Sequence, residues 1–125
     1  MYKFSLAGIE EILEINSFSK KKYPADAIYI SATLEGVLIA FSVIRLMGDK
    51  AEILDVVSVK EAPDNIMLTV MKAAMNYVDL YGIKNVISQN TEISSLLDAA
   101  GFSKGETLRK LNLEGYFECG CSGQK

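Results

Sequence analysis

Apolar and polar residues alternate with two different periods along this chain, and these periods predict an ordered series of strands and helices. Apolar residues at every second position predict strands, whereas apolar residues that recur every three or four positions predict helices. Predicted strands span residues 2–6, 27–34, 37–46, 52–59, 84–89 and 106–113, and predicted helices span residues 7–21, 64–81 and 92–100.

The order of these elements predicts one α/β domain covering residues 1–125, with a mixed, mostly antiparallel sheet flanked by helices. Glu35-Gly36 and Gly48-Asp49-Lys50 are turn sequences that connect three consecutive strands into a meander. The middle strand, residues 37–46, is apolar on both faces, which predicts a central strand covered on two sides.

Local signals mark where the helices of the second half begin and end. A five-residue loop, residues 60–64, precedes the longest helix, and Pro63 fits the first turn, where a missing N–H costs nothing. Gly82 is the stop signal for that helix. Thr91 is the predicted cap of the short third helix, and Gly101 is its stop.

Composition and charge narrow the classes of partner. Half of the residues are apolar, 23% are charged, and the net charge is −3 with a pI near 5.0. No stripe of Lys and Arg with interleaved aromatic residues occurs, so we expect no nucleic-acid partner. No apolar stretch approaches the ~20 residues needed to span a bilayer, and residues 1–11 do not form a signal peptide. We therefore expect a cytoplasmic protein that does not enter membranes.

Several catalytic and metal-binding classes are excluded by the residues that are missing. The chain has no histidine, which removes Ser-His and Cys-His nucleophilic machinery and the commonest transition-metal ligand. Cys119 and Cys121 are too close in sequence for an unstrained disulfide, and nothing near them completes a metal site within one chain. We predict no metal, and the role of the two thiols, including a bridge between chains, is left open.

Two segments carry a resemblance to a known family. The first is Val86-Ile-Ser-Gln-Asn90, followed by Leu97 and then Gly101-Phe102, and the second is the apolar strand Leu54–Val59. In this order and spacing they resemble the GNAT superfamily of acetyl-CoA-dependent N-acetyltransferases, and the resemblance covers nearly the whole chain. The fold that it implies is a central sheet in which the strands at 52–59 and 84–89 splay apart at their carboxyl ends.

The resemblance also implies a binding mode for acetyl-CoA. In that fold the pantetheine arm occupies the splay, and the matching main-chain groups here are those of Val57 and Val59. The loop that carries Lys60 and leads to Asn65 would present N–H groups and a helix dipole to the pyrophosphate. Asn90 would contact the cofactor from the other side of the splay.

A carboxylate on the central strand often removes the proton of the acceptor amine in members of that family. Asp55 matches this region and is our candidate base, acting through water, while Glu52 is the weaker candidate. The alternative is that Asp55 points outward at a strand edge or pairs with a lysine or arginine.

The chain departs from the family pattern at the cofactor loop and at one helix position. Residues 60–69 contain no glycine, Pro63 lacks an N–H, and Glu61 and Asp64 add negative charge near the expected phosphates. Leu97 stands where many relatives carry a tyrosine that protonates the leaving thiolate. Two hypotheses remain open: an acyl-CoA-dependent N-acyltransferase for a small-molecule or peptide amine, and an inactive GNAT-fold module that binds a ligand or protein. A homodimer is left open in either case.

Overall fold

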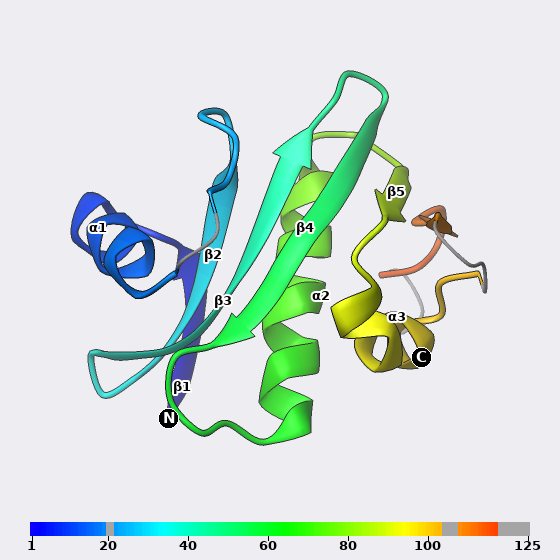
Figure 1. Ribbon diagram of the computed structural model, residues 1–125. Helices are drawn as coiled ribbons and strands as arrows, with labels where there is room; N and C mark the ends of the chain where they lie inside the picture. The colour runs from blue at the N-terminus through cyan, green and yellow to red at the C-terminus, as the bar shows by residue number, and fades with distance from the viewer. Residues whose placement is uncertain (20–21, 104–107, 118–125) are drawn as a thin grey trace.

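A computed structural model describes residues 1–19, 22–103 and 108–117 of the 125. The described residues form one six-stranded sheet whose strand order follows the order of the chain, with three α-helices packed on it (Figure 1). The elements are β1 (Tyr2–Leu6), α1 (Ile9–Phe18), β2 (Ile28–Leu34), β3 (Val37–Leu46), β4 (Lys50–Ser58), α2 (Asp64–Leu80), β5 (Asn85–Ser88), the 3₁₀ turn η1 (Thr91–Ile93), α3 (Ser94–Ala100) and β6 (Arg109–Asn112).

The predicted fold class is confirmed, and the differences from the predicted elements lie at their ends. The first helix ends at Phe18 rather than near residue 21, and residues 20 and 21 lie outside the described residues. The last strand begins at Arg109, and the first two residues of its predicted span, 106 and 107, are not described. Cys119 and Cys121 also lie outside the described residues. The predicted cap of the third helix was wrong, because Thr91 belongs to η1, which Asn90 caps, and α3 follows Ile93 without a side-chain cap.

Two apolar layers hold the helices against opposite faces of the sheet. On one face, α2 and α3 enclose the larger core, in which Met71, Met75 and Leu97 are fully buried. On the other face, α1 covers a smaller core around Ile15 and Phe41. Each side chain of this size stabilises the fold by about 1.5–3 kcal/mol when it leaves water.

The neighbouring strands β4 and β5 are parallel, whereas all other strand pairs in the described sheet are antiparallel. They pair over three positions, from Lys50↔Asn85 to Glu52↔Ile87. Beyond this point β4 continues to Ser58, while the chain leaves β5 at Ser88 and turns into η1 and α3. Figure 1 shows the two segments separating toward the end where α3 begins. The predicted splay is therefore present.

A β-bulge lies on β4 where the splay starts. Val43 of β3 pairs with Asp55, but the next residue, Ile44, pairs with Ile53, so Leu54 is an extra residue. The extra residue interrupts the alternation of side chains and main-chain groups along the strand. As a result, Ile53 and Val56, three positions apart, both face the larger core.

No helix among the described residues combines the length and the apolar character needed to cross a bilayer.

Candidate functional site

Two adjoining cavities flank the free half of β4, one of about 420 Å³ and one of about 430 Å³. We call them the α1-side cavity and the α2-side cavity after the helix that each approaches. Both are lined by Val56 and Ser58 of β4, Met67 of α2, and Glu92 and Ile93 of η1. The α1-side cavity is completed by Phe18, Ser19, Tyr23, Asp55 and Val57, and the α2-side cavity by Ala62, Asp64, Leu68, Ser95, Leu96 and Ala99.

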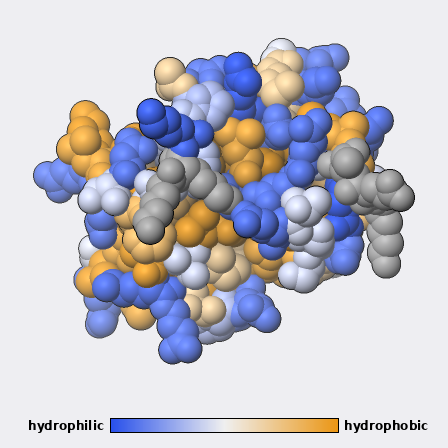
Figure 2. Space-filling view, in the orientation of Figure 1, coloured by the Kyte–Doolittle hydropathy of each residue, from blue (hydrophilic) through white to orange (hydrophobic). Residues whose placement is uncertain are grey.

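Apolar side chains reach the surface in the region of these cavities. Figure 2 shows hydrophobic residues reaching the surface in the middle of the face that Figure 1 turns to the viewer, in the region of β3 and β4. The shared lining residues Val56, Met67 and Ile93 give both cavities apolar walls. Such walls, with a few convergent polar groups, are typical of small-molecule sites.

The bulge decides which main-chain groups of β4 face the splay. The N–H of Val59 donates to the carbonyl of Ile39 on β3 at 2.7 Å, so it is already engaged. Because main-chain groups alternate in direction along a strand, those of Val57 also face β3, whereas those of Val56 and Ser58 face the splay. The predicted pair, Val57 and Val59, is thus displaced by one residue from the groups that face the gap. Whether any of them binds a cofactor stays a prediction.

Asp55 lies at the floor of the α1-side cavity, with 3% of its surface exposed. Its Oδ2 accepts a hydrogen bond from Tyr23 Oη at 2.8 Å. Its Oδ1 accepts from the N–H of Val56 at 3.0 Å and from Asn90 Nδ2 at 3.2 Å. The outward orientation that the sequence left open is excluded, and the carboxylate is held from three directions. Glu52, the weaker candidate, lies on the paired part of β4 and is not among the lining residues.

Asn90 joins the two sides of the splay at its apex. Its Nδ2 donates to the carbonyl of Leu54 at 3.0 Å as well as to Asp55, and its Oδ1 accepts from the N–H of Glu92 at 2.9 Å, which caps η1. One step nearer the paired end, Ser88 Oγ donates to the carbonyl of Ile53 at 2.9 Å. Side chains therefore replace the main-chain ladder just where it stops. A contact of Asn90 with a cofactor stays a prediction.

The amino terminus of α2 opens toward the α2-side cavity without a side-chain cap. The N–H groups of Ile66 and Met67 bond to the carbonyl of Pro63, at 3.0 and 3.2 Å. The N–H groups of Asp64 and Asn65, in the first turn, have no carbonyl within the helix to accept them. Asn65 is exposed and does not line either cavity.

Lys60 was predicted to be a cofactor-binding residue of the loop before α2. It is exposed, it does not line either cavity, and its own N–H donates to the carbonyl of Ile39 at 3.1 Å. Asp64 and Glu92 are among the residues that line the α2-side cavity.

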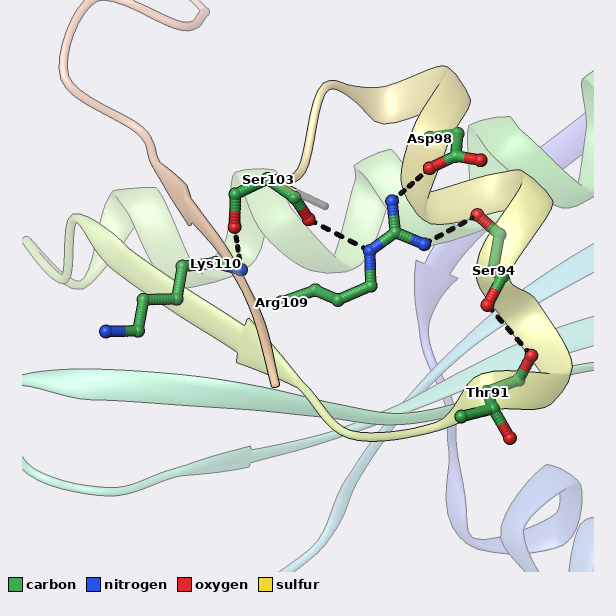
Figure 3. Close-up of polar contacts among 6 residues, drawn as sticks. All are labelled: Thr91, Ser94, Asp98, Ser103, Arg109 and Lys110. Carbon is green, nitrogen blue, oxygen red and sulfur yellow. Dashed lines mark hydrogen bonds and ion pairs between the residues drawn. The ribbon is translucent and has the colours of Figure 1, made fainter. Parts of the chain in front are cut away.

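A buried arginine that the sequence did not single out fixes α3, which forms one wall of the α2-side cavity. Arg109 is 7% exposed. Its Nε donates to the carbonyl of Ser103 at 2.9 Å and its Nη1 to the carbonyl of Ser94 at 3.1 Å, while Nη2 pairs with Asp98 (Figure 3). The guanidinium thus ties both ends of α3 to β6. An arginine within a predicted strand gave no signal of this role.

Leu97, where many relatives carry a tyrosine, is fully buried in the larger core. The residues of α3 that line the α2-side cavity are instead Ser95, Leu96 and Ala99. Among the described residues that line the two cavities, the one phenol is Tyr23, which comes from the segment before β2. Sequence reasoning missed Tyr23 because 32 positions separate it from its partner Asp55.

No profile of a known protein family matches the sequence, and no curated protein matches it either. Solved structures do match the fold. The ribosomal-protein-S18-alanine N-acetyltransferase from Escherichia coli aligns with a TM-score of 0.70 at 11% identity, covering 90% of this chain and 94% of that one. A putative GNAT-family acetyltransferase from Desulfovibrio desulfuricans aligns with a TM-score of 0.71 at 9% identity, covering 90% and 99%.

A third similar structure holds a ligand: a GNAT-family acetyltransferase from Elizabethkingia anophelis with acetyl-CoA bound. It aligns with a TM-score of 0.66 at 11% identity, covering 90% of this chain and 98% of that one. The protein described here therefore has the fold of the GNAT acetyltransferases.

Proposed function

We propose that this protein is an acyl-CoA-dependent N-acyltransferase of the GNAT type. The observation that carries the proposal is that β4 runs six residues past its last pair with β5, and both faces of that free half border a cavity. Structures with similar folds, including the acetyl-CoA complex from Elizabethkingia anophelis, support the choice of acyl donor. Acyl-CoA would supply an activated thioester carbonyl to the acceptor.

The main chain along the splay suits the amide-rich arm of an acyl-CoA. The N–H and C=O of Ser58 and the C=O of Val56 face the gap, on the side away from β3. The Val56 N–H already bonds to Asp55, so Ser58 offers the donor that this edge can give without rearrangement. The N–H groups of Asp64 and Asn65 would meet the anionic end of the donor at the amino terminus of α2.

The α1-side cavity is the proposed acceptor site. Asp55 and Glu92 place carboxylate oxygens there, which are acceptors for the N–H groups of an amine. Phe18, Val57 and Ile93 contribute apolar surface for the body of the acceptor. We therefore propose a small-molecule or peptide amine as the acceptor and the α2-side cavity as the donor site.

A second function is favoured by specific features of the donor site. The Val56 N–H is occupied by Asp55, Leu97 is buried in the core, and Asp64 places a carboxylate where phosphates would lie. At intermediate dielectric, one such charge costs an anionic ligand on the order of 1 kcal/mol. These features support a GNAT-fold module that binds a ligand or partner without acyl transfer.

Binding of acetyl-CoA separates the two functions. Titration at concentrations up to ~100 times the dissociation constant should stabilise an acyltransferase by about 2.7 kcal/mol, which is read as a rise in melting temperature. Calorimetry should give one site per chain. A melting temperature that does not move at millimolar acetyl-CoA removes the transferase and leaves the binding module.

A pair of substitutions at Ser58 localises the binding. Ser58→Pro removes the N–H that faces the splay, and the β3 pairing survives because this N–H does not point toward β3. Ser58→Ala is the matched control, since it keeps the N–H and loses only the hydroxyl. We expect acetyl-CoA to bind about tenfold more weakly to the proline variant and unchanged to the alanine variant. Equal affinities would place the donor elsewhere.

A further inference from the structure

We propose that Tyr23 accepts the proton of the acceptor amine while it passes its own phenolic proton to Asp55. This inference rests on the proposed acyl transfer and deepens it, because it assigns the proton path at the acceptor site. The sequence suggested that Asp55 would act through water; in the structure a phenol stands in that position.

The two residues occupy different depths of the α1-side cavity. Asp55 is 3% exposed at the floor, whereas Tyr23 is half-buried along the wall, and Tyr23 Oη lies 2.8 Å from Asp55 Oδ2. The ring of Tyr23 packs edge-on against Tyr29, with centroids 6.0 Å apart and planes at 72°. This contact fixes the direction of the phenol, so a substrate in the cavity meets Tyr23 before it meets the carboxylate.

The hydrogen bond from Tyr23 to Asp55 sets the direction in which the phenol would give up its proton. The single phenolic proton is donated to Asp55, and the oxygen accepts a long hydrogen bond from Ser19 Oγ at 3.4 Å. In the proposed step, an amine in the cavity donates to this same oxygen, because a phenol can act as a donor and an acceptor.

Asp55 is arranged to receive the proton at Oδ2. Its other oxygen, Oδ1, is held by the Val56 N–H at 3.0 Å and by Asn90 Nδ2 at 3.2 Å. These two hydrogen bonds fix the plane of the carboxylate. The oxygen that faces Tyr23 is thereby positioned as the end of the path.

The proposed step balances without another reactant. The bond between the amine nitrogen and the acyl carbon forms as the carbon–sulfur bond breaks, and the electron pair of that bond leaves with the thiolate. The amine proton moves to Tyr23 Oη, and the phenolic proton moves to Asp55 Oδ2. The thiolate takes a proton from solvent, and Asp55 later returns its proton to solvent through Tyr23.

The test compares Tyr23→Phe, Asp55→Asn and the double variant with the wild type, and uses Tyr29→Phe as the matched control. The control removes a hydroxyl from the ring that touches Tyr23, and Tyr29 Oη does not line either cavity. Thiol release from acetyl-CoA is followed with alkyl amines, aryl amines, a tripeptide with a free amino terminus, and water alone. Calorimetry measures acetyl-CoA binding by each variant, and melting temperatures confirm that each is folded.

We expect each single substitution to lower the turnover rate by about 100-fold, which is within the range for removing one acid–base group. The double variant should be no slower than the worse single one, because residues that act as a unit are not additive. Binding of acetyl-CoA should not change, and the Tyr29→Phe rate should stay within about twofold of wild type. A Tyr23→Phe variant as fast as wild type, or losses that multiply in the double variant, would overturn the relay.

A readout that needs no turnover checks the contact itself. In protein labelled with carbon-13 at the hydroxyl-bearing tyrosine carbon, the Tyr23 signal should shift in Asp55→Asn, and an unchanged signal would overturn the contact. A wild type that does not bind acetyl-CoA, or that binds it and never releases thiol, overturns the proposed transferase and the relay together. If the wild type binds acetyl-CoA and turns over, and Tyr23→Phe is as fast as the wild type, only the relay is overturned.

Discussion

The two edges of β4 are held in different ways. On the β3 side, seven residue pairs run from Leu46↔Ala51 to Ala40↔Ser58, with one bulge. On the β5 side, three pairs are followed by side-chain bonds from Ser88 and Asn90, and then by the cavities. One edge is a main-chain ladder, and the other is a short ladder continued by individual side chains.

The difference between the two edges predicts where this protein is sensitive to substitution. A main-chain ladder forms with almost any side chain, because every residue except proline supplies the same donor and acceptor. The segment from η1 through α3, which forms the far wall of the site, instead depends on Asn90 and Arg109. Single substitutions there should loosen the site while strands β1 to β4 remain paired.

The largest effect is expected for Arg109→Met. The change removes a buried guanidinium that bonds to Ser103, Ser94 and Asp98, and it should lower the free energy of unfolding by about 3 kcal/mol. Arg45→Met is the control, since Arg45 pairs with Asp26 at 3.2 Å in an exposed position, where the loss should be under about 1 kcal/mol. Urea unfolding measures both, and similar losses in the two variants would contradict the role given to Arg109.

Asn90→Ala should have the next largest effect. It removes the donor to Leu54 and Asp55 and the cap of Glu92, for an expected loss of about 2 kcal/mol. Amide exchange should speed up in η1 and α3 before it changes in β2 and β3, because local opening follows local bonding. Asn76→Ala on the exposed surface of α2 serves as the control and should leave exchange unchanged. If amide exchange sped up equally in all strands, η1 and α3 would not open separately from the rest of the sheet.

Two buried serines, one on each side of β4, allow a test with smaller expected losses of stability. Ser88 Oγ bonds to the Ile53 carbonyl at 2.9 Å at the apex, and Ser42 Oγ bonds to the Val70 carbonyl at 3.0 Å in the middle of the sheet. Each alanine substitution should lower the free energy of unfolding by about 1 kcal/mol. We expect Ser88→Ala alone to weaken acetyl-CoA binding, since it lies beside the splay. If both variants bound acetyl-CoA equally well, the bond at the apex of the splay would not contribute to the donor site.

The smallest effect is expected on stability at alkaline pH, and it concerns Tyr29 of β2, on the β3 side of β4. Burial raises the pKa of the Tyr29 phenol on β2 above its ordinary value of 10.0. The unfolded chain therefore loses this proton first as the pH rises through 10, and the stability that the neutral phenol contributes falls in that range. Unfolding free energies at pH 9 and pH 11 should differ less in Tyr29→Phe than in wild type. An equal difference would show that Tyr29 does not contribute.

Much of the fold follows from local patterns in the sequence. The period-two runs of β2 and β3, the turn at Glu35-Gly36 and the stop at Gly101 each act through neighbouring residues, and each is found where it was expected. Glu35 and Gly36 both have positive φ, at 51° and 82°, as that tight turn requires. The splay between β4 and β5 came from the resemblance, and the structure contains it.

The site was less predictable because its geometry depends on contacts that are distant in sequence. The bulge at Leu54 carries no glycine or proline signal, yet it moves the gap-facing groups from the predicted positions to Val56 and Ser58. Tyr23 and Arg109 acquire their roles from partners on other elements. A pattern of apolar residues reports which face is buried, and it does not report which polar side chains meet across the sheet.

The strand order of the sheet, which is the same as the chain order, has a consequence for synthesis on the ribosome. Strands β3 and β4 can each pair with the strand made just before them, so residues 28–58 need only short loop closures to form the meander of β2, β3 and β4. The parallel strand β5 has to wait for the whole of α2, and β6 for α3. We expect the wall that completes the proposed active site to be the last part to assemble, on a sheet that is already in place.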